Sequence, residues 1–124
     1  MKYELSENKK DNLFQIRALI DIPGTGVKAG SLGGWIEKEY NLSQTGKCWI
    51  YESARVFDNA QVLDNAQVYG NATIYENACI CDDAMVSGFC KIFGNARLTG
   101  KSLAFIAAII TGNTEISGNT IITS

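Results

Sequence analysis

The chain has 124 residues, of which 46% are hydrophobic and 19% charged, and its formal net charge is −2. This length and balance predict one globular domain with a modest core, and they exclude a disordered chain and a strongly basic nucleic-acid-binding protein. The amino-terminal segment lacks the apolar stretch of a secretion signal, and the longest apolar run, residues 103–110, is too short to cross a bilayer. We therefore expect a cytoplasmic protein with reduced cysteines.

Residues 1–47 predict a β-hairpin followed by an irregular segment. Residues 2–5 and 13–22 alternate like strands around a polar turn. Since an open end of β-structure exposes unpaired backbone groups, we expect this hairpin to cap the structure formed by residues 48–124. The segment at 28–39, KAGSLGGWIEKE, has glycines that allow close backbone approach, and its Trp35 is expected to plug the end of the core.

A repeat of six residues governs residues 48–124. One position of each hexad is aliphatic, with Ala104 as the only exception, and a small residue stands two places before it. A turn-forming pair such as Asp64-Asn65 or Gly94-Asn95 begins two places after it. The aliphatic series is Ile50, Val56, Val62, Val68, Ile74, Ile80, Val86, Ile92, Leu98, Ile110, Ile116 and Ile122.

Only a coil of short strands fits this period. A helix would need a period near 3.6 residues, which is absent. A meander of tight hairpins would place Phe57 opposite Ala60 and Val56 opposite Gln61, which mixes large with small and apolar with polar side chains on each face. The sequence therefore predicts an all-β fold, a parallel β-helix of about four triangular coils of about 18 residues each over residues 48–124.

This repeat resembles the hexapeptide repeat of left-handed parallel β-helix proteins of the bacterial transferase hexapeptide type. The segment VYGNAT at 68–73 departs from the usual small or acidic residue after the aliphatic one. That variant, together with the segments at 13–22 and 27–51, resembles small bacterial and phage β-helix proteins related to YdcK. The resemblance implies a left-handed coil and a bacterial or phage origin.

One of the three outer faces of this coil is too apolar for open water, and a patch of this kind usually marks an interface. We expect self-association through it, with burial under the amino-terminal hairpin and contact with another protein as the alternatives. At Ile106-Ala107 an apolar pair replaces the usual turn-formers, which favours a covered surface there. The predicted interface residues are Trp49, Tyr51, Tyr69, Met85, Leu103, Phe105, Ile106 and Ile121.

No catalytic, cofactor or metal site is predicted. Hexapeptide acyltransferases use a histidine as general base, and this chain has none. Cys79 and Cys81 share one side of a strand, but the register brings no further ligand into reach, so both are interpreted as incidental surface thiols. The other two faces offer a set of candidate ligand or partner contacts, with a solvated face of stacked aromatics as the alternative. These are Arg55, Phe57, Tyr75, Lys91, Phe93 and Arg97.

The sequence thus favours a non-enzymatic interaction β-helix that acts as a homodimer, a homotrimer or a binder of another protein, such as a phage- or prophage-encoded inhibitor of a host defence protein. We expect no membrane or nucleic-acid partner. One alternative is capture of a nucleotide between subunits, with Arg55, Lys91 and Arg97 gathered around each cleft. The other is an atypical acyltransferase in which a carboxylate, a cysteine or water replaces the histidine.

Overall fold

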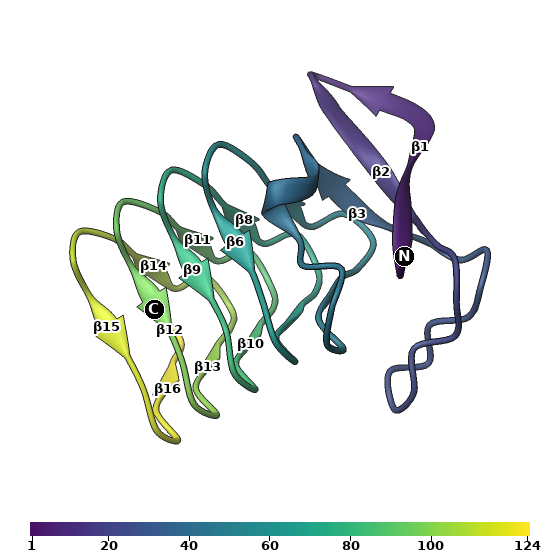
Figure 1. Ribbon diagram of the computed structural model, residues 1–124. Coiled ribbons are helices and arrows are strands. Elements are labelled where there is room, and N and C mark those ends of the chain that lie inside the picture. Colours follow the sequence, from purple (N-terminus) through teal and green to yellow (C-terminus); the bar gives the residue numbers. More distant parts are fainter.

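The hexads fold into two-residue strands joined by tight corners, and the strands stack into the three faces of a parallel β-solenoid. The structure is a computed structural model that describes residues 1–124, and Figure 1 shows the coils in side view, from the hairpin in purple to the last coil in yellow. The repeat strands are β4 (Trp49–Ile50), β5 (Arg55–Val56), β6 (Gln61–Val62), β7 (Gln67–Val68), β8 (Thr73–Ile74), β9 (Cys79–Ile80), β10 (Met85–Val86), β11 (Lys91–Ile92), β12 (Arg97–Leu98), β13 (Leu103–Ala104), β14 (Ile109–Ile110), β15 (Glu115–Ile116) and β16 (Ile121–Ile122).

Each strand pairs in parallel with the strand three hexads away, so equivalent residues stack along a face. Thr73 pairs with Lys91 and Lys91 with Ile109, for example. A five-stranded sheet contains β4, β7, β10, β13 and β16, a four-stranded sheet contains β6, β9, β12 and β15, and β5, β8, β11 and β14 belong to a seven-stranded sheet. The predicted all-β fold and triangular parallel coil are confirmed.

The inward positions of the hexads form one continuous core. The aliphatic residues from Ile50 to Leu98 are fully buried, as are the alanines that precede them from Ala54 to Ala96. They belong to a cluster of 29 buried residues that also includes Tyr3 and Ile16 of the amino-terminal segment. Small and aliphatic residues alternate because the small side chain fits at the corner and the aliphatic one fills the axis.

The hairpin caps the amino-terminal end of the coils, as predicted. Strands β1 (Tyr3–Lys10), β2 (Leu13–Ala18) and β3 (Leu32–Ile36) extend the seven-stranded sheet beyond β5. The pairs β1–β2 and β2–β3 are antiparallel, whereas β3–β5 is parallel. The predicted close approach at the glycines of β3 is confirmed, because a Cβ at Gly33 would lie 2.6 Å from the Ile50 carbonyl oxygen.

The first coil begins earlier than the hexads indicate, and the predicted count of about four coils is corrected to about five. Ile36 pairs with Val56, and Leu42 forms a parallel bridge to Val62, so the first coil needs 20 residues where later ones need 18. The 3-10 helix η1 (Glu39–Asn41) lies in this coil. The extra residues between Leu42 and Cys48 include Gln44, whose side-chain oxygen accepts hydrogen bonds from the backbone N–H groups of Lys2 and Tyr3.

The burial of the two tryptophans is the reverse of what the sequence predicts. Trp35 points outward beside Arg55 and is half-buried, so the prediction that it plugs the core is wrong. Trp49 lies on an outer face, yet it is only 1% exposed because the amino-terminal segment folds over it. The Tyr3 ring meets the Trp49 ring edge to face, with 6.3 Å between their centroids. The outward position at the first coil is therefore part of the core.

The last coil of residues 1–124 is less buried than the coils before it. Strands β14, β15 and β16 are the last strands of their sheets (Figure 1), and the inward residues Ile116 and Ile122 remain partly exposed. The chain contains no helix long and apolar enough to cross a membrane.

Candidate functional site

An exposed apolar surface surrounds one corner of the carboxyl-terminal coils. Met85, Leu103 and Ile121 stack on neighbouring strands of the five-stranded sheet, and Phe89 and Ile106 lie at the corner that follows this sheet, where the Phe89 N–H donates to the Ile106 carbonyl. Exposed fractions are 68% for Phe89, 59% for Ile106, 64% for Ile109 and 58% for Ile121. We refer to Met85, Phe89, Leu103, Ile106, Ile109 and Ile121 as the apolar corner.

Ile106 is strained as well as exposed. Its backbone φ is +63°, in the left-handed region that β-branched residues avoid. The equivalent corner positions elsewhere hold glycine, aspartate or glutamate, including Gly88 and Gly94. An isoleucine at this position therefore carries backbone strain and leaves a large apolar side chain in water.

The predicted interface residues divide into a group covered by the amino-terminal part of the chain and a more exposed group on the later coils. Trp49 is enclosed by the chain itself and drops out of the surface. Tyr51 and Tyr69 stack with 4.3 Å between ring centroids, are half-buried, and line a hollow with the loop at Pro23. Met85, Ile106 and Ile121 are exposed, and Leu103 and Phe105 are half-buried. Phe89 and Ile109 are not in the predicted interface set, but they extend the exposed group. Phe89 lies at the corner, and Ile109 lies beyond it on the seven-stranded sheet.

The candidate ligand contacts do not converge on one site. Phe57, Tyr75 and Phe93 form a ladder of stacked rings, with centroids 5.3 and 4.9 Å apart, which matches the alternative of a stacked aromatic face. Arg55 and Lys91 belong to the seven-stranded sheet and Arg97 to the four-stranded sheet. The three cations therefore do not gather within one chain.

Arg55 instead lines a pocket between the hairpin tip and the coils. This pocket of about 340 Å³ is also lined by Lys10, Asp11, Leu13, Trp35, Ser53 and Asn71. It combines an aromatic ring with two cations, and sequence reasoning missed it because it depends on where the hairpin tip comes to lie.

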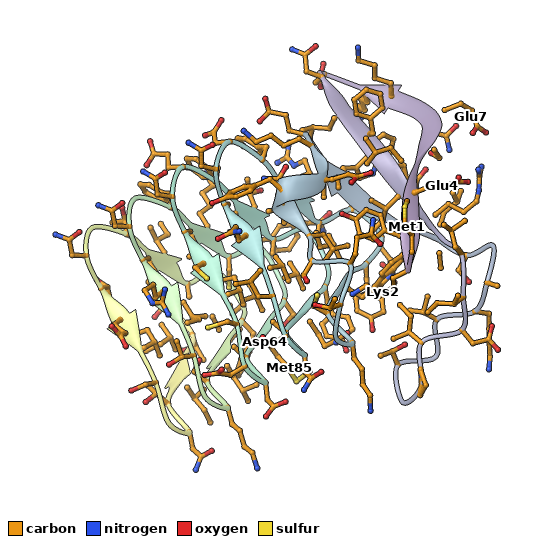
Figure 2. All side chains as sticks on the ribbon, in the orientation of Figure 1. Met1, Lys2, Glu4, Glu7, Asp64 and Met85 are labelled. Carbon is orange, nitrogen blue, oxygen red and sulfur yellow. The ribbon has the colours of Figure 1, made fainter.

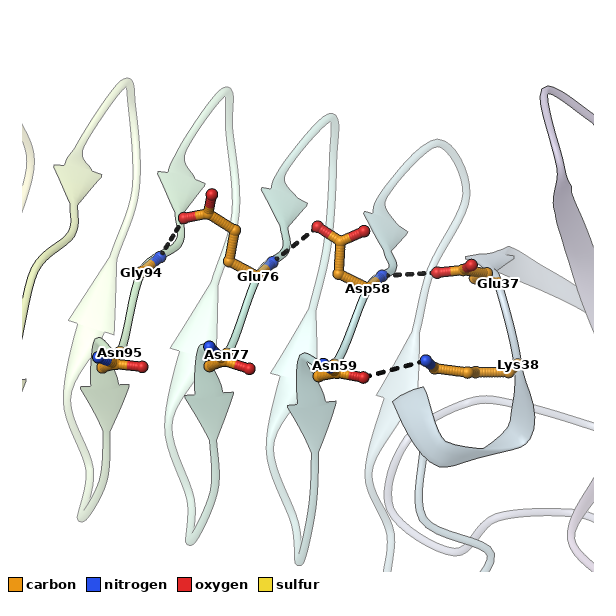
Figure 3. A pocket seen from close by; sticks show the side chains of 8 residues that line it. All are labelled: Glu37, Lys38, Asp58, Asn59, Glu76, Asn77, Gly94 and Asn95. Carbon is orange, nitrogen blue, oxygen red and sulfur yellow. Dashed lines mark hydrogen bonds between the residues drawn. The ribbon is translucent and has the colours of Figure 1, made fainter.

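Acidic residues at the corners form ladders of hydrogen bonds between coils. Figure 3 shows one ladder, in which Glu37, Asp58 and Glu76 each accept a hydrogen bond from a backbone N–H of the next coil. The bonds run to Asp58, Glu76 and Gly94 at 2.8, 3.1 and 2.9 Å. The groove along this ladder has no hydrophobic lining, and its carboxylates bind backbone N–H groups of the turns.

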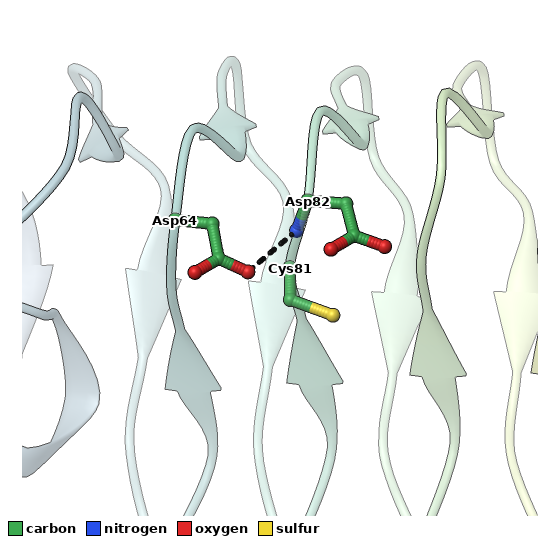
Figure 4. A group of neighbouring side chains, drawn as sticks. All are labelled: Asp64, Cys81 and Asp82. Carbon is green, nitrogen blue, oxygen red and sulfur yellow. Dashed lines mark hydrogen bonds between the residues drawn. The ribbon is translucent and has the colours of Figure 1, made fainter.

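A second corner brings thiols and carboxylates together, on the four-stranded sheet. One ligand atom from each of Asp64, Cys81 and Asp82 lies within 4.8 Å of the others (Figure 4). The expectation that no further ligand lies in reach of the thiols is therefore wrong. Cys79 and Cys81 are 8% and 6% exposed, so they are not surface thiols. Burial raises the pKa of Cys81 to about 12, and it also raises the pKa of Cys79, which Arg97 partly opposes.

A buried lysine ties the hairpin to the first coil. Lys2 is 3% exposed and lies between the hairpin and the coils, whereas Glu4 and Glu7 lie on the outer side of the hairpin (Figure 2). Its Nζ donates to the Cys48 carbonyl at 2.8 Å and contacts the Cys48 Sγ at 3.3 Å. Burial lowers the pKa of Lys2 and raises the pKa of Cys48.

Comparison with known proteins agrees with the repeat. A family model described as "YdcK Beta solenoid repeat" matches residues 66–79. A protein of Escherichia coli (strain K12) named "Uncharacterized acetyltransferase YdcK" is 39% identical over 61 residues, which cover 41% of this chain and 19% of that relative. The match therefore spans about a fifth of the length of the relative. The structure and both matches make this chain a β-solenoid whose hexapeptide repeat is similar to that of YdcK.

Proposed function

We propose that this chain is a binding solenoid that associates with a second copy of itself through the apolar corner. The observation that carries the proposal is Ile106, which is exposed and held at a positive φ where the other corners have glycine or acidic residues. Strain of this kind costs on the order of 1–2 kcal/mol and persists where something else compensates for it. Burial against a partner would compensate for both the strain and the exposed apolar area.

A second copy is the partner that the surface favours. The apolar corner extends over three coils without a charged side chain among its six members, as the core of a homodimer interface does. It includes Ile121 of β16, which stands next to the half-buried Ile122. The formal net charge of −2 opposes the approach of two copies only weakly.

Sedimentation velocity on matched variants tests this proposal. Ile106→Asp keeps a residue type that the corner accepts, since Asp58, Asp64 and Asp82 hold the same conformation, but it places a charge in the contact. We expect the wild type to sediment as an oligomer and Ile106→Asp to bind its partner at least about tenfold more weakly. Ile20→Asp is the control because Ile20 is 49% exposed and belongs to the amino-terminal part.

Self-association through the apolar corner is overturned if Ile106→Asp and the wild type sediment equally, because two equal oligomers would place the interface elsewhere. If both are monomers, another protein becomes the remaining occupant of the apolar corner. An effect of Ile20→Asp as large as that of Ile106→Asp would show instead that association is unspecific.

A second candidate function is the binding of a small anionic aromatic ligand, such as a nucleotide, in the pocket beside Arg55. Trp35 supplies a ring, and Lys10 and Arg55 supply two cations, in a volume of about 340 Å³, which suits a compact ligand. Equilibrium dialysis with ATP as the probe would test this, with Arg55→Gln as the variant and Lys91→Gln as the control. Retention of ATP by the wild type that only Arg55→Gln reduces supports the site, and no retention excludes it.

The name of the relative makes acyl transfer a third candidate. These 124 residues contain no histidine, so a general base would have to be a carboxylate or a thiol. The corner carboxylates are engaged in the ladders between coils, and the pKa of each cysteine is raised by burial. We therefore favour a non-enzymatic role. Titration with acetyl-CoA is the direct test, because saturable binding of acetyl-CoA would favour acyl transfer over the other two candidates.

A further inference from the structure

The cluster at the second corner brings together three metal-binding donors from two neighbouring coils, those of Asp64, Cys81 and Asp82. Cys79 and Cys81 occupy both outward positions of one hexad, at β9 and just after it, and Asp82 follows directly. Asp64 lies at the equivalent corner of the preceding coil, 18 residues earlier. The outward position of Cys81 holds a large residue in the earlier hexads and Ser87, Phe93 or Thr99 in the next ones, so the repeat accepts both large and small residues there.

The corner ladder orients both carboxylates and leaves each with a free oxygen. The Asp82 N–H donates to Asp64 Oδ2 at 3.0 Å, and the Gly100 N–H donates to Asp82 Oδ2 at 2.8 Å. Figure 4 shows the Cys81 sulfur on the same coil as the Asp82 carboxylate, with the Asp64 carboxylate on the neighbouring coil and the hydrogen bond from the Asp82 N–H joining the two coils. Because one oxygen of each carboxylate is fixed by backbone, the position of the other is limited, and the site is partly preorganised.

We propose that Asp64, Cys81 and Asp82 bind a divalent cation of borderline softness, with Zn²⁺ as the best fit. One sulfur and two carboxylate oxygens can supply three ligands of a tetrahedral zinc site, with water in the fourth position. Ca²⁺ and Mg²⁺ require a set of oxygen ligands that this corner does not offer. Zinc would staple two adjacent coils on the four-stranded sheet, and this role is independent of self-association through the apolar corner.

The charges around the corner are compatible with this assignment. A bound Zn²⁺ would leave one thiolate and two carboxylates with an excess of one negative charge. Arg97 stands next to Cys79 in the parallel register of β9 and β12, so its guanidinium offsets part of that excess. The first corner ladder, at Asp58 and Glu76, has Tyr75 in the place of Cys81 and no thiol in its lining, so it is the natural negative control.

Co²⁺ is the probe for this site, because thiolate ligation gives Co²⁺ an intense sulfur-to-metal charge-transfer absorption that oxygen ligands alone do not give. We expect the reduced wild-type chain to bind one Co²⁺ with this absorption and to lose it when Zn²⁺ is added. Cys81→Ser and Asp64→Asn should each weaken Co²⁺ binding by about tenfold or more. Asp64→Asn retains an oxygen that accepts the Asp82 N–H, so it tests ligation without breaking the ladder.

Cys90→Ala and Asp58→Asn are the matched controls, since Cys90 is a core residue and Asp58 belongs to the ladder without thiols. Both should bind Co²⁺ like the wild type. The proposal is overturned if the wild type shows no charge-transfer absorption with equimolar Co²⁺, or if Cys90→Ala reduces it as much as Cys81→Ser does. Should Cys81→Ser fail to fold by circular dichroism, Asp64→Asn alone decides, because unchanged affinity in that variant also overturns the site.

Discussion

At the scale of single residues, Ile106 shows how one corner departs from the rule of the others. The corner conformation suits glycine because a Cβ in the left-handed region crowds the following carbonyl oxygen. At four other corners, Asp58, Asp64, Glu76 and Asp82 each accept a hydrogen bond from a backbone N–H of the next coil, which compensates for this strain. Isoleucine has no such bond to offer, so Ile106 carries the strain without compensation inside the chain.

Ile106→Gly should therefore increase the free energy of unfolding of the monomer by about 1 kcal/mol, because it relieves the left-handed strain. Urea unfolding in dilute solution, where any oligomer dissociates, measures this. Ile109→Gly is the control: Ile109 is 64% exposed but is not among the residues with positive φ, so glycine there should lower stability by about 0.5–1 kcal/mol. Equal losses in both variants would contradict the assigned strain.

Lys2 shows the opposite case, a charged residue that the fold has enclosed. Its Nζ makes hydrogen bonds to the Cys48 and Gly46 carbonyls at 2.8 and 3.3 Å. Lys2→Met keeps the length of the side chain but removes the donor to these carbonyls. The free energy of unfolding should therefore fall by about 1–3 kcal/mol. Lys47→Met, at an exposed lysine, should stay within about 0.5 kcal/mol of the wild type in the same urea titration. Indistinguishable curves for all three proteins would show that Lys2 does not hold the cap.

At the scale of elements, the strands, corners and core were predictable because every hexad repeats the same inward, outward and corner positions. The period distinguishes inward from outward positions, and the structure follows it from Ile50 onward. What packs against an outward position is set by distant segments and was not predictable. Trp49 is covered because the hairpin folds over it, and the thiol of Cys81 lies near Asp64 because corners 18 residues apart are stacked.

The first coil was missed for a related reason. Ile36 and Leu42 keep the six-residue spacing, but two additional residues before Cys48 shift the phase of everything that follows. Those residues supply Gln44, which binds the backbone of Lys2 and Tyr3. The apolar corner was predicted in part, since Met85, Ile106 and Ile121 were identified, whereas Phe89 and Ile109 join it only through the turn of the corner.

The core also imposes a dependence of stability on pH. Burial raises the pKa of Cys90 above its ordinary value of 9.0, so the folded state retains a proton that the unfolded state releases. The resulting stabilisation is complete below the unfolded pKa and is lost as pH rises from about 9 toward the folded pKa. Cys90→Ala, which restores the alanine of the other hexads, should lose stability less steeply between about pH 8 and about pH 10 in urea titrations. Parallel slopes for wild type and variant would contradict a raised pKa.

At the scale of the whole molecule, the surface of the solenoid changes along its length. The hairpin closes one end with its own strands and side chains. The hydrogen-bonded acidic corners run from Glu37 to Asp82, whereas the exposed residues of the apolar corner run from Met85 to Ile121. This distribution favours association of two copies through the apolar corner over contact along the acidic corners.

The measurement that tests self-association most directly is the mass of the wild-type chain in solution, by light scattering across a dilution series. One chain has a mass of 13.5 kDa. We predict an oligomer at high concentration that dissociates toward this mass on dilution, as a single apolar interface of modest size requires. A mass of 13.5 kDa at every concentration would contradict the proposal and leave the apolar corner for another protein.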